Sequence, residues 1–210
     1  MKSDNKNKIG ATHRSSLSRI DKIHPVKMLL YLCLVGIGTI FLILLLAYAR
    51  TEVAMLQEVQ VRFPKFFSVS TVLILVSSYT LLRTHRFYRK DNLTKMARYL
   101  GISLALGFAF LLSQVGGWYE LAKNGIVFKG KPYGSYLYLI TALHALHVVA
   151  GIMFLIYMYF KSFFSSVDPI RTLVYIRDPF RKLQLGLLTT YWHFMGALWL
   201  TLYFVFLFLF

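Results

Sequence analysis

The chain reads MLLYLCLVGIGTIFLILLLAYA from Met28 to Ala49, with no charged residue between Lys27 and Arg50. A helix crosses the hydrocarbon core of a bilayer with about 20 apolar residues. The run is too long for the apolar core of a signal peptide, and no small-residue cleavage pattern follows it. It therefore predicts an uncleaved membrane-spanning helix.

Four further runs between charged residues have the length and composition of membrane spans. With the first run they give predicted spans at residues 28–49, 66–82, 99–119, 133–160 and 183–210, none of which contains Asp, Glu, Lys or Arg. The two-residue alternation of a membrane barrel is absent. The sequence thus predicts an all-α fold, a polytopic bundle of five transmembrane helices over residues 28–210. A polar, basic cytoplasmic tail over residues 1–27 precedes the bundle.

The composition is that of a membrane protein. Apolar residues make up 57% of the chain and charged residues 15%, whereas soluble domains carry about 25% charged residues. The net charge of +16 does not predict a nucleic acid partner, because Lys and Arg lie between the apolar runs and not along one basic face. Cys33 is the single cysteine, which excludes disulfides and multi-cysteine metal or iron–sulfur sites within one chain.

The distribution of basic residues predicts the orientation in the membrane. Of the 24 Lys and Arg residues, 18 lie in the tail and in the segments after the second and fourth spans, and 6 lie in the other two segments. Cytoplasmic segments collect Lys and Arg. The N-terminus is therefore predicted in the cytoplasm and the C-terminus on the opposite side.

Three histidines lie within the predicted spans. His144 and His147 are three residues apart, so they share one helix face with Gly151, and His193 lies on the fifth span. Imidazole is a common ligand of metals and haem. A zinc site would need a third or fourth ligand, and no carboxylate or thiolate accompanies these histidines. Packing or lipid contact is therefore the favoured interpretation, and a metal or haem site is the alternative.

The third span carries a stripe of small and polar residues. Ser103, Gly107, Gln114 and Gly117 follow helical spacing on one face. Small residues let membrane helices approach closely, and Gln can hydrogen-bond across the contact. Trp118 lies at the outer end, where aromatic residues form a belt at the membrane surface.

Several short strings together resemble the signature of cytochrome c oxidase subunit III. They are HALHVVAG at His144–Gly151, YWHF at Tyr191–Phe194, the following Trp199-Leu200, and Gln114 with Trp118 on the third span. The resemblance runs in order from about Lys27 to Phe210. It corresponds to the five-helix bacterial form, which lacks the first two helices of the seven-helix form.

The resemblance implies a non-catalytic subunit III of a respiratory haem-copper terminal oxidase in the bacterial inner membrane. Such a subunit packs on catalytic subunit I and other oxidase subunits, binds phospholipid, and supports proton uptake and stability during turnover. Haem and copper are expected in the partner subunits, with no catalytic, cofactor or metal residue in this chain. The expected lipid or packing positions are Gln114, Trp118, His144, His147, Gly151, Trp192, His193 and Trp199.

Three positions depart from the family pattern, which usually has acidic residues there. They are Gly117, Gly196 and the region of Val35. The absence of these carboxylates weakens a role in proton delivery and favours a scaffold and lipid-binding role.

The sequence is also compatible with other functions. The sequence does not distinguish cytochrome c from quinol as electron donor, so a quinol oxidase or a nitric-oxide-reductase-associated subunit of the same family is an alternative. A small electron carrier with haem b on the three histidines is another. A transporter is disfavoured, because the spans lack charged residues and the chain lacks an inverted repeat.

Overall fold

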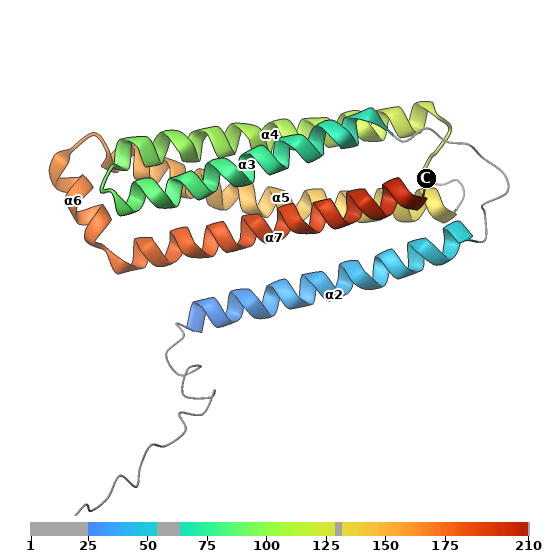
Figure 1. The fold of residues 1–210 in the computed structure, drawn as a ribbon, viewed down its shortest axis with the longest axis horizontal. Coiled ribbons are helices and arrows are strands. Elements are labelled where there is room, and N and C mark those ends of the chain that lie inside the picture. Colours follow the sequence, from blue (N-terminus) through green and yellow to red (C-terminus); the bar gives the residue numbers. More distant parts are fainter. Residues whose placement is uncertain (1–24, 54–63, 129–131, 210) are drawn as a thin grey trace, which may run out of the picture.

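The computed structural model describes residues 25–53, 64–128 and 132–209, which form α-helices and no strand within those ranges (Figure 1). The helices are α2 (Pro25–Val53), α3 (Lys65–Arg89), α4 (Leu93–Lys123), α5 (Pro132–Ser165), α6 (Pro169–Arg177) and α7 (Pro179–Leu209). Among the described residues, all of these helices except α6 are long and apolar enough to cross a membrane. The predicted all-α class with five membrane-spanning helices is confirmed.

The long helices extend beyond most ends of the predicted spans. α3 continues to Arg89, past the end of span 66–82, and α4 begins at Leu93, before the start of span 99–119. A charged residue limits the part of a helix that fits the hydrocarbon core, but it leaves the backbone hydrogen bonds intact. At the other end of the chain, α2 begins at Pro25. The rest of the predicted tail, residues 1–24, lies outside the described residues.

The α3–α4 connection is a tight turn with its own capping residue. Asp91 has a φ of 53°, in the left-handed region that reverses the chain after α3. Oδ1 of Asn92 accepts a hydrogen bond from the backbone N–H of Lys95 at 3.0 Å. This bond satisfies one of the free N–H groups at the start of α4.

Helix α6 lies in the segment between the fourth and fifth predicted spans, where no element was predicted. Asp168 caps its start, since Oδ1 accepts from the backbone N–H of Ile170 at 2.9 Å. Pro169 occupies the first turn, where a missing N–H costs nothing. The Asp168-Pro169 pair is the local sequence signal for the start of this helix.

The long helices form a bundle with α2 on its side (Figure 1). α3 packs on α4, α4 on α5, α5 on α7 and α7 on α3, which closes a four-helix ring. α2 lies against α5 and α7, and α6 crosses the end of the bundle between α5 and α7 (Figure 1). The motif helices α5 and α7 are therefore neighbours.

The predicted small-residue stripe forms part of the interior of the ring. Ser103, Gly107 and Gly117 on α4 are all buried. Ser77 Oγ on α3 donates to the carbonyl oxygen of Ser103 at 3.2 Å, and the hydroxyls of Thr80 and Ser103 are 2.7 Å apart. Small side chains with hydroxyl contacts let α3 and α4 pack closely, as predicted.

Helix α2 buries only one narrow face. Leu34, Phe41 and Tyr48 are buried, at the seven-residue spacing of a contact stripe. The Tyr48 ring meets Phe206 of α7 edge to face, with 5.3 Å between ring centroids. Most of its other large apolar side chains are exposed, as on a helix surrounded by lipid or by another membrane protein.

Candidate functional site in the bundle core

Trp192 on α7 contacts all three other helices of the four-helix ring. Its Nε1 donates to Ser77 Oγ on α3 at 3.1 Å. A Cβ atom added at Gly107 on α4 would lie 3.0 Å from the indole, and one added at Gly151 on α5 would lie 3.1 Å from it. Real Cβ atoms rarely come so close. The two glycines therefore form a slot that the fully buried indole fills.

Trp199, two turns further along α7, is held in the same way. Its Nε1 donates to Thr71 Oγ1 on α3 at 3.0 Å. Its ring meets Phe67 and Phe110 edge to face, with centroid distances of 5.8 Å and 5.3 Å. Thr71, Phe67 and Phe110 were not among the predicted positions. Through these residues the α7 motif contacts α3 and α4.

His144 is completely buried against these rings. Its ring centroid lies 5.0 Å from that of Trp199, 5.7 Å from Phe110 and 6.3 Å from Phe41 of α2. Its Nε2 lies 3.2 Å from the carbonyl oxygen of Met195. A carbonyl oxygen only accepts, so Nε2 carries the proton and donates. His144 thereby joins α5 to α7 by a hydrogen bond and to α2 and α4 by ring contacts.

His147 is half-buried, one turn further along α5. Its Nδ1 donates to the carbonyl oxygen of Leu143 at 2.7 Å, and its ring lies 5.8 Å from that of Phe41. The carbonyl oxygen of His147 accepts from the Tyr191 hydroxyl at 2.8 Å. This residue contributes to both the α2–α5 and the α5–α7 contacts.

The structure does not join the third histidine to the other two. His193 is half-buried, and its Nε2 has no hydrogen-bond partner among the described residues. Across residues 25–53, 64–128 and 132–209, no group of three His, Cys, Asp or Glu side chains is close enough to hold a metal ion.

Gln114 and Trp118 on α4 differ in whether their polar side-chain atoms form hydrogen bonds. Gln114 is buried, but neither its Oε1 nor its Nε2 has a partner within the described part of the chain. The predicted hydrogen bond from Gln114 across a helix contact is therefore not found. Trp118 Nε1 donates to Thr141 Oγ1 of α5 at 2.9 Å. The polar atom of Trp118 thus has a hydrogen-bond partner on the neighbouring helix.

The positions that lack the family's carboxylates have distinct environments. A Cβ atom added at Gly117 would lie 2.4 Å from the Phe67 ring. The ring therefore fills the space that a side chain at position 117 would need. A Cβ atom added at Gly196 would lie 3.0 Å from Ser78 Oγ. Val35 is exposed on the outer side of α2.

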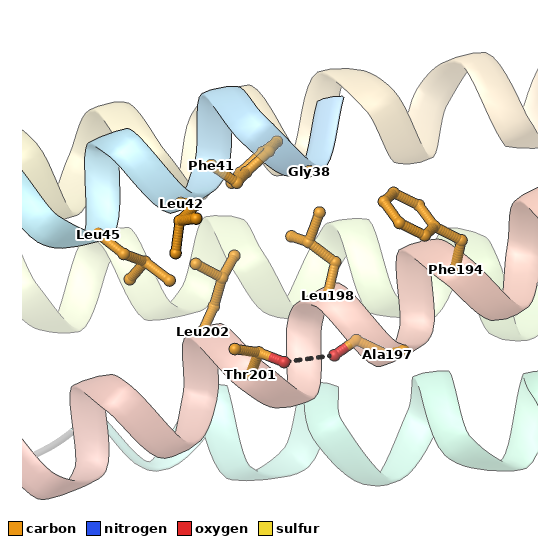
Figure 2. A pocket seen from close by; sticks show the side chains of 9 residues that line it. All are labelled: Gly38, Phe41, Leu42, Leu45, Phe194, Ala197, Leu198, Thr201 and Leu202. Carbon is orange, nitrogen blue, oxygen red and sulfur yellow. Dashed lines mark hydrogen bonds between the residues drawn. The ribbon is translucent and has the colours of Figure 1, made fainter. Parts of the chain in front are cut away.

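An apolar groove runs between α2 and α7, with a volume of about 260 Å³ (Figure 2). The Thr201 hydroxyl donates to the Ala197 carbonyl oxygen of its own helix at 3.1 Å, so it presents no free polar group to the groove (Figure 2). The groove is lined by Gly38, Phe41, Leu42, Leu45, Phe194, Ala197, Leu198, Thr201 and Leu202.

The part of this chain that is similar to known proteins contains this core. The cytochrome c oxidase subunit III family model matches residues 54–210. The chain is 27% identical over 139 residues to "Probable cytochrome c oxidase subunit 3" of Mycobacterium leprae, covering 66% of this chain and 64% of that protein. It is 30% identical over 135 residues to the protein of the same name in Rickettsia prowazekii, covering 64% and 45% of the two chains. It is 29% identical over 135 residues to "Cytochrome c oxidase subunit 3" of Aepyceros melampus, covering 64% and 47%.

Within the described residues, five long apolar helices and a buried core with tryptophans and a histidine define a multi-pass helical membrane protein. The family model covers α3 to α7, which contain the residues of this core. The chain belongs to the cytochrome c oxidase subunit III family, whose members are subunits of haem-copper oxidases. It spans less than two thirds of the length of the curated relatives named above.

Proposed function

We propose that this chain is a non-catalytic subunit of a respiratory haem-copper terminal oxidase that packs against the catalytic subunit I and stabilises the complex during turnover. The observation that carries the proposal is the slot in which Trp192 lies. The family's motif residues on α5 and α7 meet there as packing partners, with Gly151 against the indole. An accessory subunit needs a rigid bundle of this kind, because a partner recognises a fixed surface.

The contacts of the histidines support a structural role. A haem or metal ligand must direct an unhindered ring nitrogen at the ion. His144 donates from Nε2 to the Met195 carbonyl oxygen, and its Nδ1, which has no hydrogen-bond partner among the described residues, is buried in a side chain surrounded by aromatic rings from α2, α4 and α7. We therefore assign haem and copper to the partner subunits, and we assign this chain no redox centre.

Phospholipid is the second ligand class that we propose. The groove between α2 and α7 is apolar and lies along helices that cross the membrane (Figure 2). A lipid acyl chain matches both its chemistry and its surroundings, because within the hydrocarbon core van der Waals packing against apolar side chains favours such a contact. The location that we propose is the bacterial inner membrane, with the N-terminus in the cytoplasm and the C-terminus outside, on the basis of the distribution of Lys and Arg.

Copurification tests the proposal. The full chain, carrying an affinity tag, is expressed in its own host at its natural level and extracted in a mild detergent. We expect a haem-copper catalytic subunit to copurify, and its partners to identify the electron donor as cytochrome c or quinol. Recovery of the chain with no haem-copper subunit, under conditions that keep the oxidase intact, would overturn the proposal.

A further inference from the structure

Two polar side chains in the centre of the bundle have atoms without a hydrogen-bond partner. Gln114 of α4 is 1% exposed, and neither its Oε1 nor its Nε2 has a partner among the described residues. His144 of α5 is fully buried, and its Nδ1 has no partner there either. Buried polar atoms of folded proteins are nearly always hydrogen-bonded, to the protein or to an ordered water. These atoms therefore indicate a ligand that bonds to both side chains.

The packing of α4 on α5 fixes how the two helices are aligned. They run antiparallel, side by side (Figure 1). Trp118 Nε1 of α4 donates to Thr141 Oγ1 of α5 at 2.9 Å. Towards the other end, a Cβ atom added at Gly107 of α4 would lie 3.3 Å from Ile152 of α5. The two contacts are eleven residues apart on each helix. Because both helices rise equally per residue, this alignment holds along the stretch between them.

The alignment places Gln114 opposite Ala145, the neighbour of His144. Ala145 is buried, and its methyl group fills little of the space in front of the longer glutamine. The His144 ring lies 5.7 Å from that of Phe110, one turn away from Gln114 on α4. Gln114 and His144 are both buried, so they face the interior of the bundle at neighbouring levels of the same helix contact.

The proton on His144 decides what the ligand must supply. Its Nε2 donates to the Met195 carbonyl oxygen, so Nδ1 carries no proton and only accepts. Gln114 Oε1 also only accepts. The ligand must therefore donate twice, as the two O–H groups of a water molecule do. A metal ion would lack ligands, because the described residues bring no three His, Cys, Asp or Glu side chains together.

We propose that one water molecule is bound between α4 and α5 in the centre of the bundle, where it donates one O–H to His144 Nδ1 and the other to Gln114 Oε1. Buried waters make about two to four hydrogen bonds with otherwise unpaired groups, so these two partners suffice. Since hydrocarbon offers no replacement, the water joins α4 to α5 and, through His144, to α7. This inference goes beyond the proposed function and does not depend on it.

Proton-detected solid-state NMR of the full chain in lipid bilayers, with ¹⁵N-labelled histidine, tests the proposal. It measures the transfer of magnetisation from water to each imidazole ring, and the signal that His144→Leu removes is that of His144. We expect transfer from a bound water to the His144 ring. Gln114→Met keeps the length of the side chain but removes the amide, so it should reduce this transfer severalfold. The His193 ring, which is only half-buried, should give the same signal in both chains.

Gln184→Met is the matched control. Gln184 lies on α7 and accepts from Arg181 Nη1 at 2.6 Å, away from the α4–α5 contact. This variant should leave the transfer to His144 unchanged. A second measurement compares the unfolding of Gln114→Met, His144→Leu and the double variant. A shared water predicts that the losses are not additive, with a coupling of at least about twofold in the folding equilibrium constant.

Absence of transfer from water to His144 in the original chain would overturn the proposal, and this result needs no variant to fold. Equal transfer in Gln114→Met and in the original chain would overturn it as well, because Gln114 would then hold no water. A direct bond from Gln114 Nε2 to His144 Nδ1, or strictly additive losses in the unfolding measurement, would also contradict the shared water. The chain is studied without partner subunits, so a failure here leaves the copurification result unaffected.

Discussion

Trp192 and Ser77 are joined by a hydrogen bond from the indole Nε1 to the hydroxyl oxygen at 3.1 Å, although 115 positions separate them in the chain. The same Ser77 oxygen donates to the carbonyl oxygen of Ser103 on α4. The serine thus connects the motif helix α7 to the α3–α4 pair. Because hydrocarbon offers no replacement partner, this contact contributes to the position of α7 in the bundle.

Ser77→Ala should therefore destabilise the bundle. It removes both hydrogen bonds and leaves the Trp192 N–H unpaired, at an expected cost of about 1–2 kcal/mol in the free energy of unfolding. Thr39→Ala is the control, since Thr39 lies on an exposed face of α2 and bonds only to its own helix. Reversible unfolding in mixed detergent measures the free energy of unfolding of both variants. Equal stability of the two variants would refute the role assigned to Ser77.

The slot around Trp192 gives a second prediction. Gly107→Ala places a methyl group 3.0 Å from the buried indole, and overpacking of this kind costs about 1–3 kcal/mol. Gly186→Ala is matched to it, because no atom lies within 4 Å of the added carbon. That variant should be as stable as the original chain or more stable, since Ala favours the helix. Thermal unfolding of both variants in the same detergent measures their stability. A larger loss of stability in Gly186→Ala than in Gly107→Ala would contradict the slot.

His144→Leu tests whether the buried histidine acts in packing or in chemistry. The leucine keeps an apolar side chain but removes the hydrogen bond to Met195, at an expected cost of about 1–3 kcal/mol. An oxidase with this variant should start at a near-normal rate of oxygen consumption. It should then lose activity, this subunit or bound lipid during turnover.

The control for His144→Leu is the subunit and phospholipid content of the same purified complex, measured before and after turnover. A complex with full subunit and lipid content, normal stability and an initial rate near zero would show that His144 takes part in the reaction.

The proposed orientation predicts which ends a membrane-impermeant thiol reagent reaches. Cys33 is exposed on α2, so a Cys33→Ala background is used. In that background Phe210→Cys should react from outside intact cells, whereas Lys90→Cys, in the α3–α4 turn, should react only after the membrane is opened. The reverse pattern would show that the distribution of Lys and Arg misassigns the sides.

Much of the fold follows from local sequence, because a membrane penalises charge wherever it is buried in lipid. The uncharged runs therefore marked the five long helices, and the helical spacing of Ser103, Gly107 and Gly117 marked the face of α4 that packs inward. The helix ends were less well predicted. A helix can continue past the end of its apolar part, as α3 does to Arg89.

The partners in the core could not be predicted in the same way. The pairing of Trp199 with Thr71, and of Gly117 with Phe67, depends on which helices become neighbours, and helical periodicity does not encode that choice. A usable signal was present on α3, where Phe67, Thr71 and Ile74 follow helical spacing and are all buried. The spacing likewise places Gln114 on the inward face of α4 but names no partner for it, and none is found among the described residues.

The proposal that this chain holds no redox centre is tested most directly by its haem and copper content before and after separation from its partners. The tagged chain is purified as a complex in mild detergent, then released by a stronger detergent, and both fractions are analysed by absorption spectroscopy and metal analysis. The complex should contain haem and copper in proportion to the catalytic subunit. The released chain should contain neither and should keep its helical content. One haem or copper per released, folded chain would contradict the assignment of this protein as an accessory subunit without a redox centre.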